Sequence, residues 1–296
     1  MHPLGYPELT KQQHTEKPVM TSAVIDLRPL DRCGASIDGI DVTSASDDQI
    51  DVIRTAVFQH GVVFIEGRVL APEEQIAFAR RLAPIVINRY FPKAERYPEI
   101  AKVEKSESQH TNIGGVWHTD HSYDVAPSMG SVLMAVKTPP VGGDTLFADL
   151  YAAYDALSPG LKTTLRTLKA HHASAHAFGE GGHYAKSDRA ELGGFTDTPE
   201  AVHPVVITHP GSGKPVLYVN PAFTTGIVGW TREESMALLN YLYQHATQDR
   251  FVRRFQWRPG SMAIWDNRCT WHHALNDYQG HHRLMHRITL EGGPLS

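Results

Sequence analysis

Short apolar runs bounded by turn residues make up most of the chain. Residues 62–65, Val-Val-Phe-Ile, lie between Gly61 and Gly67 and are typical of a buried strand. The same kind of pattern recurs along the sequence and indicates a protein built mainly from short strands. We predict further strands over residues 23–27, 36–42, 131–136, 145–148, 205–208, 215–219, 251–257, 261–265 and 283–290.

Capping residues and prolines mark where helices begin. Ser46-Asp47-Asp48-Gln49 fits a capping box that opens an amphipathic helix, and Gly61 ends that helix. Thr231-Arg232-Glu233-Glu234 is a second capping box. Its helix carries Met236, Leu239 and Leu242 on one face. Three further helices are predicted over residues 72–82, 151–157 and 159–168, with prolines at the starts of the first and third.

Turn residues suggest how neighbouring strands pair. Residues 205–208 and 215–219 flank Pro-Gly-Ser-Gly and are predicted to form a hairpin. Residues 251–257 are predicted to pair with 261–265 around Pro259-Gly260. Many short strands, few helices and no alternation of strand and helix favour an antiparallel sandwich or jelly roll. In such a fold, segments that are distant in sequence meet inside.

Two segments lack a clear period. Residues 85–115 contain Asn, Pro, Lys and paired glycines, and we expect substrate-recognition loops there. Residues 171–200 are rich in Gly, His, Ser and Asp, which indicates a long loop or lid. Four histidines fall in this second segment, but their spacing matches no compact ligand set, so a solvated loop is the better interpretation.

Length and charge narrow the class of protein. The 296 residues contain no composition break, so we expect one domain over residues 23–296 preceded by a polar tail over 1–22, either mobile or a docking arm. The formal charge of −4 and scattered basic residues argue against a nucleic-acid partner. No apolar run could span a membrane or form a signal peptide. We therefore expect a cytoplasmic protein. We also expect a homo-oligomer.

Trp117-His118-Thr119-Asp120 is the first candidate for chemistry. If residues 116–121 are extended, His118 and Asp120 project from the same face and converge on one point. With a second histidine, such a pair forms the facial triad of non-haem Fe(II) oxygenases. A single His-X-Asp is weak evidence in a chain with 18 histidines. A second candidate, His272, follows a predicted strand and a polar turn.

The last predicted strand carries two arginines four residues apart. Arg283, Met285, Arg287 and Thr289 share one face of this strand. If that face points inward, the arginines require anionic partners, because burying an unpaired charge costs several kcal/mol. The pattern is equally compatible with a solvated arginine face and a core built from the opposite side, where Leu284 and Ile288 lie.

Taken together, these motifs resemble the taurine dioxygenase family of 2-oxoglutarate-dependent Fe(II) oxygenases. The resemblance runs from about Ala23 to Gly292 and rests on His118-Thr119-Asp120, Gly142-Gly143-Asp144-Thr145, Trp265-Asp266-Asn267-Arg268, His272 and the two arginines. It implies a double-stranded β-helix, a cupin-like jelly roll with flanking helices. It also implies Fe(II) bound by His118, Asp120 and His272, with 2-oxoglutarate and O2 as co-substrates. Thr145 and Arg283 would hold the distal carboxylate of 2-oxoglutarate.

By the same resemblance, Arg287 faces an acidic group on a small organic substrate. Candidates are a sulfonate, a sulfate ester and a carboxylate such as an aryloxyalkanoate. Gly114 stands where the taurine enzyme has an amine-binding Asn, which disfavours taurine and favours a less polar or bulkier acid. The other expected substrate contacts are Asn88, Arg89, Tyr90 and Phe91 in the recognition loop, and Tyr123, Phe178 and Phe223 as possible walls.

Two rival classes follow from the same residues. A non-catalytic jelly-roll binding protein would keep the fold, but it has little reason to bury three ligands and two arginines. A zinc hydrolase could use two histidines and a carboxylate with one open position. The arginine pair has no obvious role in hydrolysis and therefore favours the oxygenase.

Overall fold

The computed structural model describes residues 25–94 and 96–295, so the predicted tail over 1–22 lies outside the described residues. Strands are the commonest element in this part of the chain. They are β1 (Asp26–Pro29), β2 (Ala35–Asp38), β3 (Val62–Ile65), β4 (Ile85–Val86), β5 (Lys93–Ala94), β6 (Tyr97–Lys105), β7 (Gly130–Lys137), β8 (Thr145–Asp149), β9 (Lys169–Ala173), β10 (Glu200–Pro204), β11 (Val206–Thr208), β12 (Pro215–Leu217), β13 (Thr224–Ile227), β14 (Val252–Phe255), β15 (Met262–Asp266), β16 (Thr270–Ala274) and β17 (Arg283–Leu290).

The predicted helices are all present. Both capping boxes form: Ser46 accepts from the backbone N–H of Gln49, and Thr231 accepts from that of Glu234. Within the described residues, every helix is too short or too polar to traverse a lipid bilayer. The helices are α1 (Asp47–His60), α2 (Pro72–Leu82), α3 (Leu150–Asp155), α4 (Pro159–Leu165), α5 (Ala175–Phe178) and α6 (Arg232–Ala246), with 3-10 turns at Tyr184–Lys186, Ala190–Leu192 and Asp249–Phe251.

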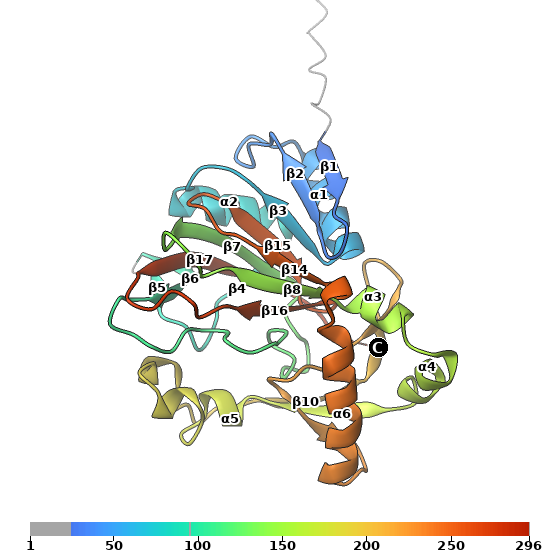
Figure 1. The fold of residues 1–296 in the computed structure, drawn as a ribbon. Coiled ribbons are helices and arrows are strands. Elements are labelled where there is room, and N and C mark those ends of the chain that lie inside the picture. Colours follow the sequence, from blue (N-terminus) through green and yellow to red (C-terminus); the bar gives the residue numbers. More distant parts are fainter. Residues whose placement is uncertain (1–24, 95, 296) are drawn as a thin grey trace, which may run out of the picture.

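The largest sheet runs in the order β1-β2-β3-β15-β7-β17-β6-β5, with β4 paired to β17. Its pairings are antiparallel except for β2 beside β3. The sheet separates two cores, because alternate residues of β7 point to opposite faces. Val132 and Met134 pack against α1 and α2, whereas Leu133 and Ala135 face the strand β8 and its neighbours. Figure 1 shows the two helices covering the outer face of this sheet.

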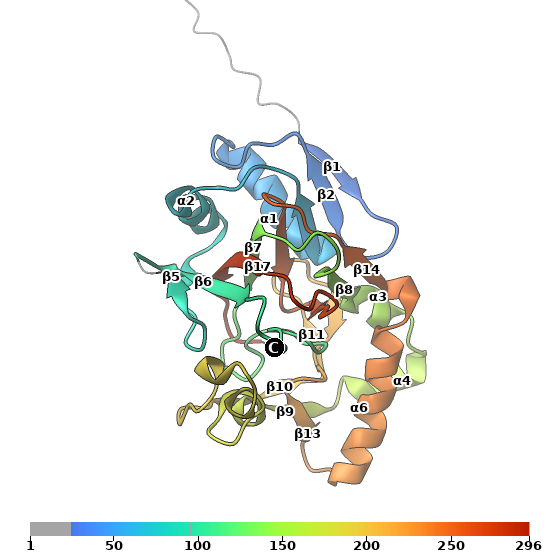
Figure 2. The same cartoon turned by 60° about the vertical axis from the view of Figure 1, so that its left-hand side comes forward.

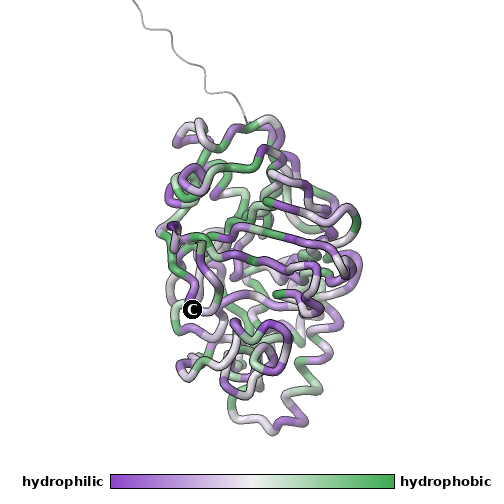
Figure 3. The backbone as a smooth tube through the Cα atoms, turned by 90° about the vertical axis from the view of Figure 1, so that its left-hand side faces the viewer, coloured by the Kyte–Doolittle hydropathy of each residue, from purple (hydrophilic) through white to green (hydrophobic). Residues whose placement is uncertain are grey.

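A second sheet, ordered β14-β8-β16, lies against the inner face of the large one. Phe147 and Trp257 from this side pack with Trp265 and Met285 from the large sheet. A separate sheet of β10-β9-β13 lies with α6 and α5 at the end of the molecule opposite α1 and α2 (Figures 1 and 2). The chain is therefore mainly β with flanking helices. Hydrophobic stretches along the backbone are short and interrupted by hydrophilic ones (Figure 3).

The predicted pairing of residues 251–257 with 261–265 is wrong. β14 pairs with β8, whereas β15 pairs with β3 on one side and β7 on the other. Every residue of Met262–Asp266 is buried, so this strand belongs in the centre of a sheet and needs a neighbour on each side. The turn at Arg258–Ser261, closed by the Ser261 hydroxyl, carries the chain from one sheet to the other.

Two weakly patterned segments contain more structure than the sequence indicates. Residues 85–115 include the nine-residue strand β6, in which Lys102 and Glu104 interrupt the apolar pattern. The segment 171–200 begins inside β9, so His171 and His172 lie in a strand between β10 and β13 rather than in a loop. From residue 174 to 192 the segment consists mainly of short helices and turns, and residues 193–199 are irregular apart from an isolated bridge at Phe195.

Candidate active site

The two candidate histidines lie side by side because their backbones pair. The N–H of His118 donates to the carbonyl of His272 at 3.1 Å, and the reverse bond measures 2.9 Å. Residues 116–121, considered above as extended, contain only this isolated bridge at His118. The ring centroids of the two histidines are 4.0 Å apart. The strand β16 therefore delivers His272 directly to the turn that carries His118 and Asp120.

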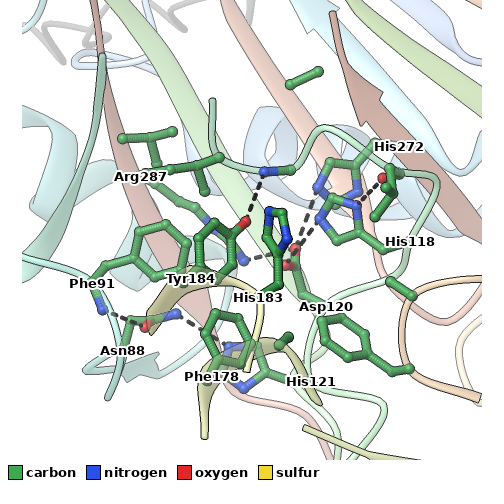
Figure 4. Close-up of a pocket in the computed structure, with 18 of the residues that line it drawn as sticks. Asn88, Phe91, His118, Asp120, His121, Phe178, His183, Tyr184, His272 and Arg287 are labelled. Atoms are coloured by element: carbon green, nitrogen blue, oxygen red, sulfur yellow. Dashed lines mark hydrogen bonds and ion pairs between the residues drawn. The ribbon is translucent and has the colours of Figure 1, made fainter. Parts of the chain in front are cut away.

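The Asp120 carboxylate completes the cluster. Its oxygens lie 3.7 Å from Nε2 of His118 and 3.6 Å from Nε2 of His272. All three residues are buried, and their ligand atoms fall within 4.8 Å of one another. Figure 4 shows the two imidazoles and the carboxylate pointing toward one another. The structure thus brings the three sequence-predicted ligands to one place.

The electrostatics favour the protonation states that metal ligation requires. Nδ1 of His118 lies 2.8 Å from the Val116 carbonyl, which assigns the proton to Nδ1 and leaves Nε2 free as a ligand. Burial lowers the pKa of His118 and holds the pKa of His272 well below its usual value, so both imidazoles are neutral at pH 7. Burial raises the pKa of Asp120, but Arg287 and the two imidazoles outweigh burial and keep the pKa low.

Arg283 and Thr145 lie in the same cavity as the histidine pair. Arg283 is 4% exposed as a residue, and its Nε donates to the carbonyl of Gly143 at 3.1 Å. Its Nη2 is buried and has no hydrogen-bond partner among the described residues. The Thr145 hydroxyl accepts from the Trp257 indole at 2.9 Å, and the Arg283 guanidinium lies 5.9 Å from that ring. A buried guanidinium with a free N–H is a ready partner for a carboxylate.

Arg287 points inward from the same face of β17. Its Nε donates to the Ser131 hydroxyl at 3.0 Å, and its Nη2 lies 2.7 Å from Oδ2 of Asp120. The guanidinium also faces the rings of Phe91 and Trp265, with centroid distances of 5.6 Å and 5.7 Å. The inward orientation of the arginine face is therefore confirmed, and the solvated alternative is excluded.

One cavity of about 390 Å³ contains this whole constellation. Its walls are mostly apolar and come from the recognition loop, the segment 174–199 and the turn after β12. The cavity therefore offers a charged centre surrounded by hydrophobic contacts, which is typical of small-molecule sites. Of the expected substrate contacts, those that line it are Asn88, Phe91, Tyr123, Phe178, Phe223 and Arg287.

Comparison with known proteins agrees with this geometry. The family model described as taurine catabolism dioxygenase TauD, TfdA family matches residues 26–289. The chain belongs to the TauD/TfdA family. An alkylsulfatase of Acinetobacter baylyi is 34% identical over 266 residues, covering 88% of this chain and 83% of that protein. An (S)-phenoxypropionate/alpha-ketoglutarate-dioxygenase of Sphingobium herbicidovorans is 31% identical over 283 residues, covering 93% and 98%.

Solved structures are also similar over nearly the whole chain. A taurine dioxygenase from Burkholderia xenovorans is 32% identical with a TM-score of 0.77, and the match covers 92% of both chains. AAD-2, solved in complex with Mn(II) and N-oxalylglycine, is 26% identical with a TM-score of 0.75. That match covers 92% of this chain and 100% of the other.

Two expected substrate contacts of this TauD/TfdA chain lie outside the cavity wall. Arg89 forms an ion pair with Asp124 at 3.0 Å and does not line the cavity. Tyr90 stacks behind Phe178 with ring centroids 4.2 Å apart, and its hydroxyl lies 3.3 Å from that of Ser174. The bend over residues 88–91 therefore places Asn88 and Phe91 toward the cavity and Arg89 and Tyr90 away from it.

Several cavity residues of the TauD/TfdA site were not identified from the sequence. His121 follows Asp120 directly and lines the cavity, so its position next to a predicted ligand could have identified it. His176, His183 and Tyr184 come from the segment expected to be a lid, and the segment does contribute to the wall. The histidine-rich composition of that segment gives no indication of which ring points inward. Only its position over the cavity decides this (Figure 4).

A second cluster of possible ligands, His209, Asp266 and Cys269, is structural. His209 Nε2 lies 3.0 Å from Asp266, while its Nδ1 accepts from the backbone N–H groups of Gly211 and Ser212. The Asp266 carboxylate also accepts from the side chain and backbone of Arg268. Both imidazole nitrogens are therefore occupied, and the network fixes the turn that leads into β16 and His272.

Proposed function

We propose that this chain is an Fe(II)- and 2-oxoglutarate-dependent dioxygenase that hydroxylates a small organic anion, with a sulfate ester or sulfonate as the preferred class. The observation that carries the proposal is the convergence of His118, Asp120 and His272 beside Arg283, whose buried Nη2 has no partner among the described residues. Family membership and the names of the similar proteins support it independently.

The donor set fits a ferrous ion. Two neutral imidazoles and one carboxylate form the facial triad used by non-haem Fe(II) oxygenases and leave positions open for other ligands. The remaining net positive charge suits an anionic chelator. The fold supports the same assignment, since the β14-β8-β16 sheet faces the large sheet across the core formed by Phe147, Trp257, Trp265 and Met285, as expected for a double-stranded β-helix.

The protein's own residues account for binding of 2-oxoglutarate. Arg283 offers a planar guanidinium to the distal carboxylate, and the Thr145 hydroxyl offers a further hydrogen bond. The Trp257 indole fixes the Thr145 hydroxyl. The similar structure of AAD-2 holds N-oxalylglycine, which differs from 2-oxoglutarate by one NH in place of a methylene. When bound, Fe(II), 2-oxoglutarate and O2 supply the oxidising equivalent that replaces a C–H hydrogen with a hydroxyl group.

Substrate placement follows from the charge and shape of the cavity. Arg287 supplies the cation for an acidic head group, and Ser131 orients it. The rings of Phe178, Tyr123 and Phe223 supply apolar surface for the rest of the molecule. Burying that surface also excludes water from the site. The wall therefore favours a hydrophobic alkyl or aryl body over the small amine of taurine.

The products identify the substrate class. An alkyl sulfate R-CH2-OSO3⁻ with O2 and 2-oxoglutarate gives R-CH(OH)-OSO3⁻, succinate and CO2. The hydroxyl proton passes to the leaving sulfate oxygen as the C–O bond breaks, which yields an aldehyde and hydrogen sulfate. A sulfonate gives an aldehyde and hydrogen sulfite by the corresponding C–S cleavage. An aryloxyalkanoate hydroxylated at the ether carbon gives a phenol and a 2-oxo acid.

The test is a screen of alkyl sulfates, sulfonates and aryloxyalkanoates with Fe(II) and 2-oxoglutarate. We expect succinate formation to depend on a sulfate ester or sulfonate, with release of sulfate or sulfite in equal amount. Release of phenol from phenoxypropionate would support the second candidate, which the similarity to the Sphingobium enzyme favours. Absence of substrate-dependent succinate with all three classes would contradict the proposal and favour a binding protein.

A further inference from the structure

His121 has an unusual backbone beside the metal ligands. Within the described part of the chain, His121 is the non-glycine residue whose φ angle is positive, at 59°. A left-handed conformation costs a non-glycine residue about 1 to 2 kcal/mol, so surrounding contacts must hold it. The residue is 3% exposed, and its side chain lines the cavity directly after Asp120. A strained residue at this position suggests a role for its side chain.

Both ring nitrogens of His121 are held by protein groups. Nδ1 lies 3.0 Å from the Asp124 carboxylate, which only accepts, so the proton resides on Nδ1. Nε2 lies 3.3 Å from the side-chain nitrogen of Asn88 and accepts from it. Arg89 pairs with the other side of Asp124 at 3.0 Å. The imidazole therefore bridges the turn after the metal ligands and the recognition loop.

Asn88 extends this bridge through the recognition loop. Its side-chain oxygen accepts from the backbone N–H of Tyr90 at 2.9 Å and from that of Phe91 at 3.2 Å. The Phe91 ring then faces Arg287, and Arg287 contacts Asp120. The contacts form a closed circuit from Asp120 through His121, Asn88 and Phe91 to Arg287 and back. Figure 4 shows Asn88 between Phe91 and His121.

We propose that His121 is a positioning residue that fixes the recognition loop, residues 88–91, relative to the metal-ligand turn. Through Phe91 and Arg287 it holds the substrate where hydroxylation stays coupled to consumption of 2-oxoglutarate. This inference rests on the proposed function for its catalytic consequence only. The link between His121 and the loop is a property of the protein without cofactors. Misplacement of a substrate by about 1 Å can lower a rate by a factor of about 100.

The first test is hydrogen exchange of the backbone amides in the protein without metal. His121→Asn keeps a residue that tolerates the left-handed backbone but is too short to span Asn88 and Asp124. We expect exchange at Tyr90 and Phe91 to accelerate at least tenfold, while α6 is unchanged. The control is His203→Asn, because His203 is equally buried and contacts the Asp124 carbonyl without joining the bridge. Unchanged exchange in His121→Asn, or equal acceleration in the control, would overturn the proposal.

The second test is the ratio of aldehyde to succinate with hexyl sulfate as the probe. We expect His121→Asn and Asn88→Ala each to lower this ratio at least threefold, with no further loss in the double variant, because both cut one bridge. The His203→Asn control should keep the ratio of the unaltered protein. If the unaltered protein makes no succinate with any probe, the proposed function fails and the exchange result still decides the bridge. An unchanged ratio in an active His121→Asn protein would refute the coupling role.

Discussion

Nη2 of Arg287 lies 2.7 Å from Oδ2 of Asp120, so the last strand reaches the metal-ligand turn directly. Arg283 lies on the same face of that strand and lines the same cavity, and its buried Nη2 has no hydrogen-bond partner among the described residues. We therefore expect the two arginines to bind different anions. Arg287 would bind the acidic group of the substrate beside the proposed metal ligand Asp120, and Arg283 would bind the distal carboxylate of 2-oxoglutarate.

Replacing each arginine by alanine should separate these roles. Losing one partner of a buried charge pair costs about 2 to 5 kcal/mol, a factor of about 30 or more in affinity. Arg287→Ala should raise the KM for the organic anion by at least that factor and leave the KM for 2-oxoglutarate within about threefold. Arg283→Ala should do the reverse. Steady-state kinetics with each substrate varied in turn measure both values, and equal losses in both variants would show that the division is wrong.

Asp120→Ala should abolish turnover through loss of iron. The remaining pair, His118 and His272, lacks the anionic ligand that completes the triad. Iron content after anaerobic loading and desalting, together with succinate formation, checks this. Asp155→Ala is the matched control, since Asp155 is an exposed carboxylate at the end of α3 and should leave both values unchanged. Undiminished succinate in the Asp120 variant would remove this residue from the ligand set.

Parts of the fold and of the site could be predicted because their signals are local. The Ser46 capping box involves neighbours in sequence, and the alternation along β17 places Arg283 and Arg287 on one face whichever way the strand is packed. The pairing of His118 with His272 is not local. The local pattern of neither segment specifies the other. This contact could be predicted only from the resemblance to a known family.

The errors arose where tertiary packing decides the outcome. β6 carries Lys102 and Glu104 among its apolar residues, and it forms a strand because β17 offers it a long partner. Arg89 and Tyr90 point away from the cavity because Arg89 pairs with Asp124 and Tyr90 stacks on Phe178. A sequence pattern records which residues can form a strand or a wall, but these partners come from other elements of the fold.

A side chain added at Gly114 should crowd the imidazole of His118, which lies next to it. A Cβ added at this residue would lie 3.0 Å from Cε1 of His118, and its φ of 75° already disfavours other residues. Gly114→Ala should therefore displace His118 and lower kcat by at least tenfold. Gly213→Ala is the control, since Gly213 has a φ of 70° but nothing within 4 Å of the added Cβ. It should lose only the stability that the backbone conformation costs, as seen in Tm, and keep kcat. Equal kcat in both variants would contradict the steric argument.

His172 should make the protein less stable in acid. Burial lowers the pKa of His172 to about 3 from an ordinary value of 6.5, so the folded state excludes a proton that the unfolded state binds between these values. Stability contributed by the neutral ring is fully present above pH 6.5 and falls as the pH drops toward 3. The slope from this residue is about 1.4 kcal/mol per pH unit near pH 5.

Replacing His172 should flatten this dependence. In His172→Asn, the free energy of unfolding from urea titrations at pH 7, 6 and 5 should fall less steeply, by about 1.4 kcal/mol per pH unit at the acid end. His171→Asn is the control, because His171 is the adjacent residue on the exposed face of β9. Its slope should match that of the unaltered protein. An unchanged slope in the His172 variant would mean that the ring binds a proton as readily in the folded state as in the unfolded state. Other groups would then set the acid limit of the fold.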